Sequence, residues 1–264
     1  MLAISKAIAN TDFKSSLVPF ITAGYPDLGS TSKLISLLDA QGVSAIELGI
    51  PYSDALADGP IIQESSRIAL NQQVYVEKVL ALVNEIGSTV RTPIIIFTYL
   101  NPILSRGIDL FIKEIANAGA KGLIIPDLPI EEADYFIALC TLYKIELILF
   151  IALTSSEERI KQILSKAPGC IYLVSSYGVT GHRDRLNEGL SQVVTKIKKY
   201  SNKPIMLGFG ISNEDQVAEI IKSNLGVNAI VMGSAFIKKI ADNVSHDSYS
   251  SVENFCRNIK NSMK

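Results

Sequence analysis

Two carboxylic acids stand close together in the segment AIELGIPYSDALADGP, at Glu47 and Asp58. Glu47 interrupts an apolar run, and strand alternation would turn its side chain away from those of Ile46 and Leu48. Burial of such a carboxyl group would raise its pKa toward the range that a general acid or base needs. Two plainer interpretations stay open: Glu47 as a strand-end residue in a salt bridge, and Asp58 as part of an ordinary Asp-Gly-Pro turn.

Two glycine-containing motifs near the end of the chain have the composition of a phosphate site. They are GFGIS, from Gly208 to Ser212, and GSAF, from Gly233 to Phe236. Glycine lets backbone N–H groups approach an anion closely, and a helix that begins after Ser234 would add a favourable dipole. Glycines that merely end strands are the alternative for either motif alone, and the presence of both motifs favours phosphate binding.

These residues follow short apolar runs that recur along the chain. The runs are continuous rather than alternating, which is typical of parallel strands covered on both faces. We expect strands in the following eight segments: LVPFIT from Leu17, SAIELG from Ser44, PIIIFTY from Pro93, GLIIPD from Gly122, ELILFIAL from Glu146, CIYLVSS from Cys170, PIMLGFG from Pro204 and NAIVMGS from Asn228.

Amphipathic stretches that end at glycine separate these runs and predict helices. Eight strand–helix units fill the chain, so we predict an α/β fold, a (β/α)8 TIM barrel with a single catalytic domain over residues 1–264. Residues 1–12 would form an extra N-terminal helix at the bottom of the barrel. An interval of about 50 residues between the second and third strands suggests an enlarged loop. An open doubly wound sheet is the alternative architecture.

Composition excludes several classes of function. The chain has 264 residues, 48% of them hydrophobic, and a formal net charge of -1, so no basic field attracts nucleic acid. Its two histidines and three unpaired-looking cysteines predict neither a metal site nor a disulfide framework. No apolar run approaches the roughly 18 residues of a membrane span, and the N-terminus does not resemble a secretion signal. We therefore expect a soluble protein.

Together the motifs ELGIPYSDALADGPIIQ, YLVSSYGVTG, GFGIS and GSAF, with PFITAGYP near the start, closely resemble the tryptophan synthase α subunit family. The likeness covers almost the whole chain, and the first motif is long and specific. The resemblance implies a lyase of tryptophan biosynthesis. Its reaction would be the reversible retro-aldol cleavage of indole-3-glycerol phosphate to indole and glyceraldehyde 3-phosphate.

The resemblance also implies roles for individual residues. Glu47 would be the catalytic acid and base, and Asp58 would face the indole nitrogen. The residues expected to bind substrate are Phe20, Tyr99, Tyr172, Thr180, Gly181, Gly210, Gly233 and Ser234. Taken alone, Tyr99 and Tyr172 would more often be packing residues at strand ends.

A partner is implied in the same way. The family works as an α2β2 heterotetramer with a β subunit that carries pyridoxal phosphate, whereas no cofactor or metal is expected in this chain. Contacts are expected near residues 52–55 and 176–187. Two departures from the family pattern, Ala55 in place of proline and Ser176 in place of a lid arginine, bear on loop closure more than on the reaction.

Two other functions stay open at this level. The phosphate motifs would suit another sugar-phosphate enzyme, such as an epimerase or isomerase, and product analysis would distinguish it from a lyase. A barrel that only regulates a partner is the non-catalytic alternative, although the presence of Glu47 and Asp58 argues against it. A bacterial cytoplasm and a plastid stroma, with the gene encoded in the plastid, both suit a chain without a transit peptide.

Overall fold

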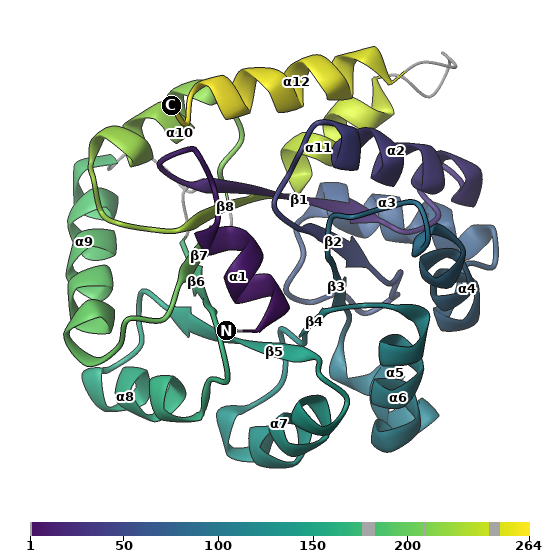
Figure 1. Cartoon of the computed structure of the whole chain (residues 1–264), viewed down its shortest axis with the longest axis horizontal. Helices are drawn as coiled ribbons and strands as arrows, with labels where there is room; N and C mark the ends of the chain where they lie inside the picture. Colours follow the sequence, from purple (N-terminus) through teal and green to yellow (C-terminus); the bar gives the residue numbers. More distant parts are fainter. Residues whose placement is uncertain (1, 176–182, 209, 243–248) are drawn as a thin grey trace.

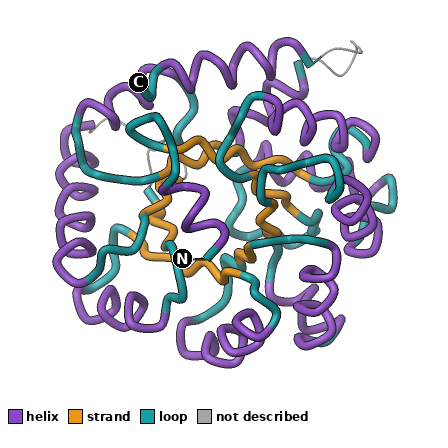
Figure 2. The backbone as a smooth tube through the Cα atoms, viewed as in Figure 1, coloured by secondary structure: helices purple, strands orange, loops and turns teal. Residues whose placement is uncertain are grey.

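The computed structural model describes residues 2–175, 183–208, 210–242 and 249–264. Within these ranges eight parallel strands close into a barrel in chain order, each hydrogen-bonded to the next and the eighth to the first. Figure 1 shows helices packed around the outside of the strands, and Figure 2 shows the ring of strands enclosed by these helices. The prediction of a (β/α)8 barrel is confirmed, and the open-sheet alternative is wrong.

Each strand lies in one of the eight apolar segments predicted from the sequence. The strands are β1 (Ser16–Thr22), β2 (Ile46–Gly49), β3 (Ile94–Phe97), β4 (Gly122–Ile124), β5 (Glu146–Ala152), β6 (Ile171–Val174), β7 (Ile205–Gly208) and β8 (Ala229–Met232). Nearly every strand residue is buried, because the barrel interior covers one face and the outer helices cover the other.

Helices connect the strands and flank the barrel at both ends of the chain. They are α1 (Ala3–Ala9), α2 (Leu28–Ala40), α3 (Pro60–Asn71), α4 (Val76–Ile86), α5 (Leu100–Arg106), α6 (Ile108–Ala118), α7 (Ala133–Leu142), α8 (Glu157–Lys166), α9 (Arg183–Tyr200), α10 (Glu214–Lys222), α11 (Ser234–Ala241) and α12 (Ser250–Asn261), with a 3-10 turn at Ile130–Glu132. The long interval between β2 and β3 holds both α3 and α4, so the enlarged loop expected there is largely helical.

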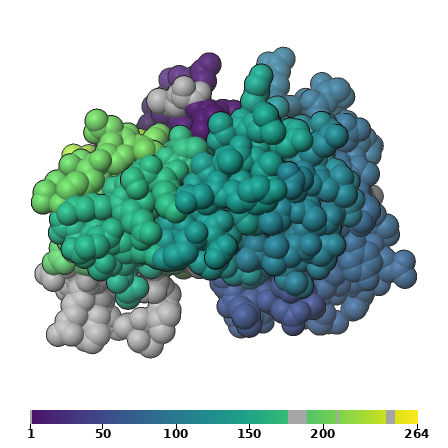
Figure 3. Space-filling view, turned by 90° about the horizontal axis from the view of Figure 1, so that it is seen from below, coloured from purple at the N-terminus to yellow at the C-terminus, as the bar shows by residue number. Residues whose placement is uncertain are grey.

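The predicted N-terminal helix is α1, and it lies across the amino-terminal opening of the barrel (Figure 1). Ile4 and Ile8 of this helix are fully buried. The carboxylate of Glu146, at the start of β5, accepts hydrogen bonds of 3.0 Å from the N–H groups of Ile4 and Ser5. A buried carboxylate at a helix N-terminus satisfies amides that have no partner within the helix. In Figure 3 the purple N-terminal segment lies on one rim of the barrel, and the blue-violet segment around residue 50 lies on the opposite rim.

Strand register brings the predicted functional residues to the carboxyl end of the barrel. Glu47 in β2 is paired with Phe20 in β1 and with Ile95 in β3. The loops that follow the strands lie at this end, where active sites of this fold are built. None of the described helices is long and apolar enough to cross a lipid bilayer.

Candidate active site

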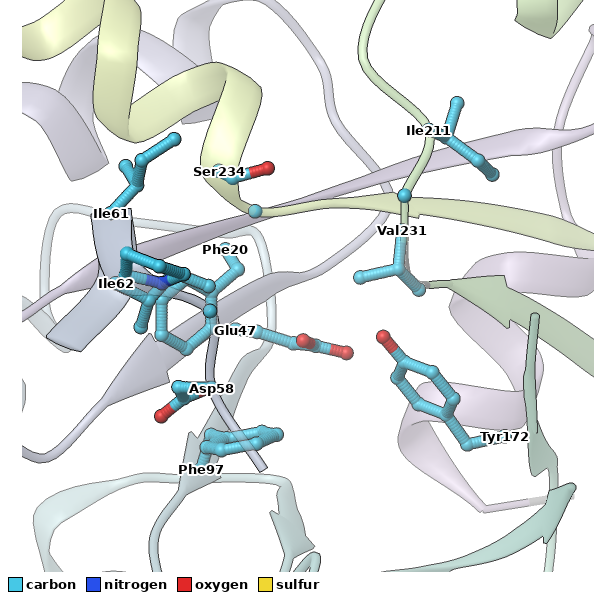
Figure 4. A pocket seen from close by; sticks show the side chains of 14 residues that line it. Phe20, Glu47, Asp58, Ile61, Ile62, Phe97, Tyr172, Ile211, Val231 and Ser234 are labelled. Carbon is cyan, nitrogen blue, oxygen red and sulfur yellow. The ribbon is translucent and has the colours of Figure 1, made fainter. Parts of the chain in front are cut away.

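A cavity of about 260 Å³ opens among the carboxyl ends of the strands (Figure 4). Its wall combines two carboxylic acids, a tyrosine, several apolar side chains and backbone that is rich in glycine. The described lining residues are Phe20, Glu47, Asp58, Gly59, Pro60, Ile61, Ile62, Phe97, Tyr172, Gly210, Ile211, Val231, Gly233 and Ser234. A small, mostly apolar cavity with a few convergent polar groups is typical of a small-molecule site.

Glu47 projects from β2 into this cavity, as strand alternation predicts. Its side chain is 1% exposed, and among the described residues its Oε1 atom has no hydrogen-bond partner. Burial away from water raises the pKa of Glu47 well above its ordinary value. Burial therefore favours the protonated form of Glu47, which can give its proton to a bound molecule. The salt-bridge alternative for this residue is not supported, since no ion pair involves Glu47 within the described chain.

Asp58 lies in the loop between β2 and α3 and faces the same cavity (Figure 4). Burial raises its pKa to about 6, and a hydrogen bond from Tyr99 partly opposes this rise. The Tyr99 hydroxyl donates to Oδ2 of Asp58 at 3.0 Å and accepts from the N–H of Ala57, also at 3.0 Å. At neutral pH Asp58 is mostly ionised, so the cavity holds one carboxyl group that favours its neutral form and one that favours its charged form.

Backbone from the last two strand ends forms the opposite part of the cavity. Gly210 follows β7, and Gly233 and Ser234 stand where β8 passes into α11. The first N–H groups of α11 have no partner within the helix and carry partial positive charge. No lysine or arginine is among the described lining residues, so a phosphate bound here would be held by backbone N–H groups and the Ser234 hydroxyl.

Tyr172 of β6 lies across the cavity from Glu47, and the two side chains point toward one another in Figure 4. Burial raises the pKa of Tyr172 well above its ordinary value, and the neighbouring Glu47 and Asp58 raise it further, so its phenol stays protonated. The ring has space because Gly208, on the adjacent strand, lacks a side chain. A Cβ atom at that position would come within 2.0 Å of the Tyr172 hydroxyl oxygen.

The structure brings together most of the residues predicted from the sequence. Those that line the cavity are Phe20, Glu47, Asp58, Tyr172, Gly210, Gly233 and Ser234. Tyr99 is not among the described lining residues and instead contacts Asp58 from behind. Thr180, Gly181 and Ser176 lie outside the described residues.

Sequence reasoning missed several apolar lining residues, namely Ile61, Ile62, Phe97, Ile211 and Val231. Ile61 and Ile62 follow the LADGP motif directly, so their position beside Asp58 was a usable signal. Phe97 and Val231 had no such signal, because an apolar residue that faces a site reads the same as one that faces the core. No group of three or more potential metal-ligating side chains occurs in the part of the chain that the structure describes.

The sequence of the whole chain is similar to those of known enzymes. The family described as "Tryptophan synthase alpha chain" matches residues 7–264. The chain belongs to this family. The alpha chain of Gracilaria tenuistipitata var. liui is 53% identical over 100% of this chain and 97% of its own length. That of Pyropia yezoensis is 50% identical over 100% and 99%, respectively.

Solved structures of the family have the same fold. The tryptophan synthase subunit alpha of Legionella pneumophila superposes with a TM-score of 0.87 at 31% identity, covering 100% of this chain and 98% of its own. Tryptophan synthase alpha chains are lyases that cleave indole-3-glycerol phosphate in tryptophan biosynthesis. Neither the sugar-phosphate isomerase nor the epimerase considered above is needed to explain the cavity.

Proposed function

We propose that this chain cleaves indole-3-glycerol phosphate in the cavity at the carboxyl end of the barrel, with Glu47 as the proton carrier. The observation that carries the assignment is the buried Glu47 carboxyl, whose Oε1 atom has no hydrogen-bond partner among the described residues, in a cavity that also holds Asp58 and the backbone of Gly233 and Ser234. The whole chain acts as one catalytic domain.

The reaction needs two proton movements at neighbouring atoms. Protonation of indole C3 turns the ring into an electron sink, and the hydroxyl on the adjacent side-chain carbon loses its proton as the carbon–carbon bond breaks. The bonding electrons return to the indole ring, and the hydroxyl-bearing carbon becomes the aldehyde of glyceraldehyde 3-phosphate. Glu47, whose burial favours the protonated form, gives the first proton and as a carboxylate accepts the second.

Positive charge develops on the indole nitrogen once C3 is protonated. Asp58, which is mostly ionised above its pKa of about 6, stabilises this charge electrostatically. Phe20 and Phe97, whose rings meet edge to face at 5.5 Å, provide apolar walls for the indole ring. The phosphate binds at Gly210, Gly233 and Ser234, and its binding energy fixes the reacting end of the substrate. Thr180 and Gly181 complete this part of the site in the proposal.

The chain needs no cofactor of its own in this proposal, because both steps are proton transfers. Its partner is the β subunit, which carries pyridoxal phosphate, in an α2β2 assembly that consumes the indole. Because the related alpha chains come from red algae and cyanobacteria, we place the protein in a plastid stroma or a bacterial cytoplasm.

Indole release by Glu47→Gln tests the proposal. The amide has the shape of the carboxyl group but cannot carry the proton, so we expect kcat to fall by about 10²–10⁴-fold while inhibition by inorganic phosphate is retained. Glu85→Gln, at an exposed position on α4, is the matched control and should leave the rate unchanged. Cleavage by Glu47→Gln at the wild-type rate would refute the assignment. Lack of turnover by the wild type, even with the β subunit, would favour a regulatory role.

A further inference from the structure

The loop between β2 and α3, residues 52–59, carries Asp58, and the Gln63 side chain of α3 makes two hydrogen bonds to its backbone. We propose that Gln63 is a positioning residue, whose side-chain amide clamps the backbone of this loop so that the Asp58 carboxylate faces the substrate. The inference rests on the role proposed above for Asp58. Nothing in the sequence motif itself assigned a function to Gln63.

The contacts of Gln63 are specific to the loop backbone. Its Nε2 atom donates to the carbonyl oxygen of Ala55 at 3.1 Å and to that of Asp58 at 2.9 Å. The Asp58 N–H also donates to the Ala55 carbonyl, at 3.1 Å. The two hydrogens of the Gln63 amide therefore bond the first and the last carbonyl of the Ala55–Asp58 turn, and both hydrogens are used.

The helix supplies the geometry that this clamp needs. Gln63 is the fourth residue of α3, and its N–H and that of Ile62 both donate to the Gly59 carbonyl at 3.0 Å. Side chains of a helix lean toward its N-terminus, so the Gln63 amide reaches back over the loop. Ile61 and Ile62 in the same turn line the cavity, and the clamp thus ties the loop to a wall of the site.

Other parts of the loop are held from elsewhere in the fold: Ala55 is buried, and Tyr52 packs against Tyr99 with ring centroids 5.3 Å apart and accepts a hydrogen bond from Asn101. Leu56 at its apex is 93% exposed, and the Ala55 N–H makes no backbone hydrogen bond within the described chain. The Asp58 end of the loop is also attached to Tyr99, whose hydroxyl accepts from the Ala57 N–H and donates to the Asp58 carboxylate. If the backbone turn opened, the Asp58 carboxylate would also lose this hydrogen bond, because the carboxylate and the backbone move together.

Two substitutions of Gln63 test the clamp in the full chain with its β subunit. Gln63→Met keeps the length and helix propensity but removes the donors, and Gln63→Glu places acceptor oxygens against two carbonyl oxygens. We expect kcat for indole release to fall about tenfold in Gln63→Met and further in Gln63→Glu, because misplacement of a reacting group is costly. Inhibition by inorganic phosphate should not change, since the phosphate end of the cavity is untouched.

The dependence of kcat on pH distinguishes a positioning role of Gln63 from a general structural role. A released loop exposes Asp58 to water, so the acid limb near pH 6 should move to lower pH in Gln63→Met. Arg67→Met is the matched control: Arg67 lies one turn further along α3, is exposed and pairs with Glu64 of the same helix, so its replacement should change neither kcat nor the acid limb. Ala55→Pro in the Gln63→Met background should restore part of kcat, because proline limits the freedom of the released loop.

Hydrogen exchange of the backbone supplies a readout that does not depend on turnover. Amides of Ala57 and Asp58 should exchange faster in Gln63→Met than in wild type or Arg67→Met. Unchanged exchange would overturn the clamp, and faster exchange with unchanged kcat and pH profile would overturn its role in positioning Asp58. A wild-type chain that exchanges as expected but never releases indole would instead overturn the proposed function.

Discussion

Glu47 and Asp58 are the same chemical group in two environments. Glu47 is buried in the barrel interior, and its Oε1 atom has no hydrogen-bond partner in the part of the chain that the structure describes, whereas Asp58 lies at a loop end and accepts a hydrogen bond from Tyr99. Burial raises both pKa values, that of Glu47 well above its ordinary value and that of Asp58 to about 6, where the hydrogen bond from Tyr99 opposes the rise. A difference of this kind lets one carboxyl carry a proton while the other supplies negative charge.

At this scale, Asp58→Asn should stabilise the fold while it removes activity. The folded-state pKa of about 6 lies about 2 units above the ordinary 3.8, so the ionised form costs about 2–3 kcal/mol of stability. This cost is present above about pH 6, diminishes as pH falls, and is absent below about pH 4, where Asp58 is protonated in both states. In urea unfolding, Asp58→Asn should be more stable than wild type at pH 8 and equally stable at pH 4. An equal difference in stability at both pH values would contradict the link between the raised pKa of Asp58 and the stability of the fold. Indole release should fall about 10²-fold.

Two buried contacts between elements of this barrel depend on the size or the charge of one side chain. Gly208 in β7 has no side chain and so leaves space for the Tyr172 ring of β6. Glu146 in β5 accepts hydrogen bonds from the first turn of α1. The former contact shapes the active site, and the latter closes the opposite end of the barrel.

Gly208→Ala should displace Tyr172, because the added Cβ would stand 2.0 Å from its hydroxyl oxygen. We expect a loss of about 1–3 kcal/mol in unfolding free energy and a lower kcat. Gly189→Ala in α9 is the matched control: no atom of the described residues lies within 4 Å of the added Cβ, and alanine favours a helix by up to about 1 kcal/mol. Urea unfolding and indole release measure both variants, and a stable, fully active Gly208→Ala would rule out the predicted clash.

Glu146→Gln should destabilise the fold without any direct effect on the active site. The Glu146 carboxylate also accepts from the Ser5 hydroxyl and from the Cys170 N–H, and an amide would place its own N–H groups against some of these donors. An unsatisfied buried donor costs about 1–3 kcal/mol, so the midpoint of urea unfolding should fall. Glu158→Gln, exposed on α8, serves as the control. If both variants unfolded at the wild-type midpoint, the buried contacts of Glu146 would not matter to stability.

Two large apolar side chains are exposed at the end of the molecule that carries the active site. Leu56 in the β2–α3 loop and Leu104 on α5 are 93% and 52% exposed, and both follow the carboxyl ends of strands. A partner that covers this end of the barrel would bury both side chains, and their burial would stabilise the complex. We therefore extend the expected β-subunit contact from residues 52–55 to include Leu104.

A charge at Leu104 should weaken this contact and leave the isolated chain unchanged. With Leu104→Asp we expect a higher concentration of β subunit for half-maximal stimulation of indole release, by about tenfold or more, because a buried unpaired charge opposes association. Leu142→Asp is the control, since Leu142 is 69% exposed but ends the helix that leads into β5, at the opposite end of the barrel. Equal stimulation of both variants would place the contact elsewhere.

The amino-acid sequence by itself determined the eight strand–helix units, because eight continuous apolar runs are separated by amphipathic helices, and it favoured a barrel over an open doubly wound sheet. It also placed Glu47 on the strand face opposite to Ile46 and Leu48, whereas closure of the barrel decided that this face is the interior. Asp58 could not be distinguished from a turn residue on local grounds alone, because Asp-Gly-Pro forms turns in any fold.

The tertiary structure alone decided what surrounds these residues. Tyr99 lies 41 positions after Asp58 and hydrogen-bonds it, and Tyr172 reaches the cavity only because Gly208 on the next strand has no side chain. The structure also showed that the Gln63 amide donates to the carbonyls of Ala55 and Asp58 and that Phe97, part of the core, lines the cavity as well. Such contacts depend on barrel closure and register, which bring together segments far apart in the chain, and no local pattern records them.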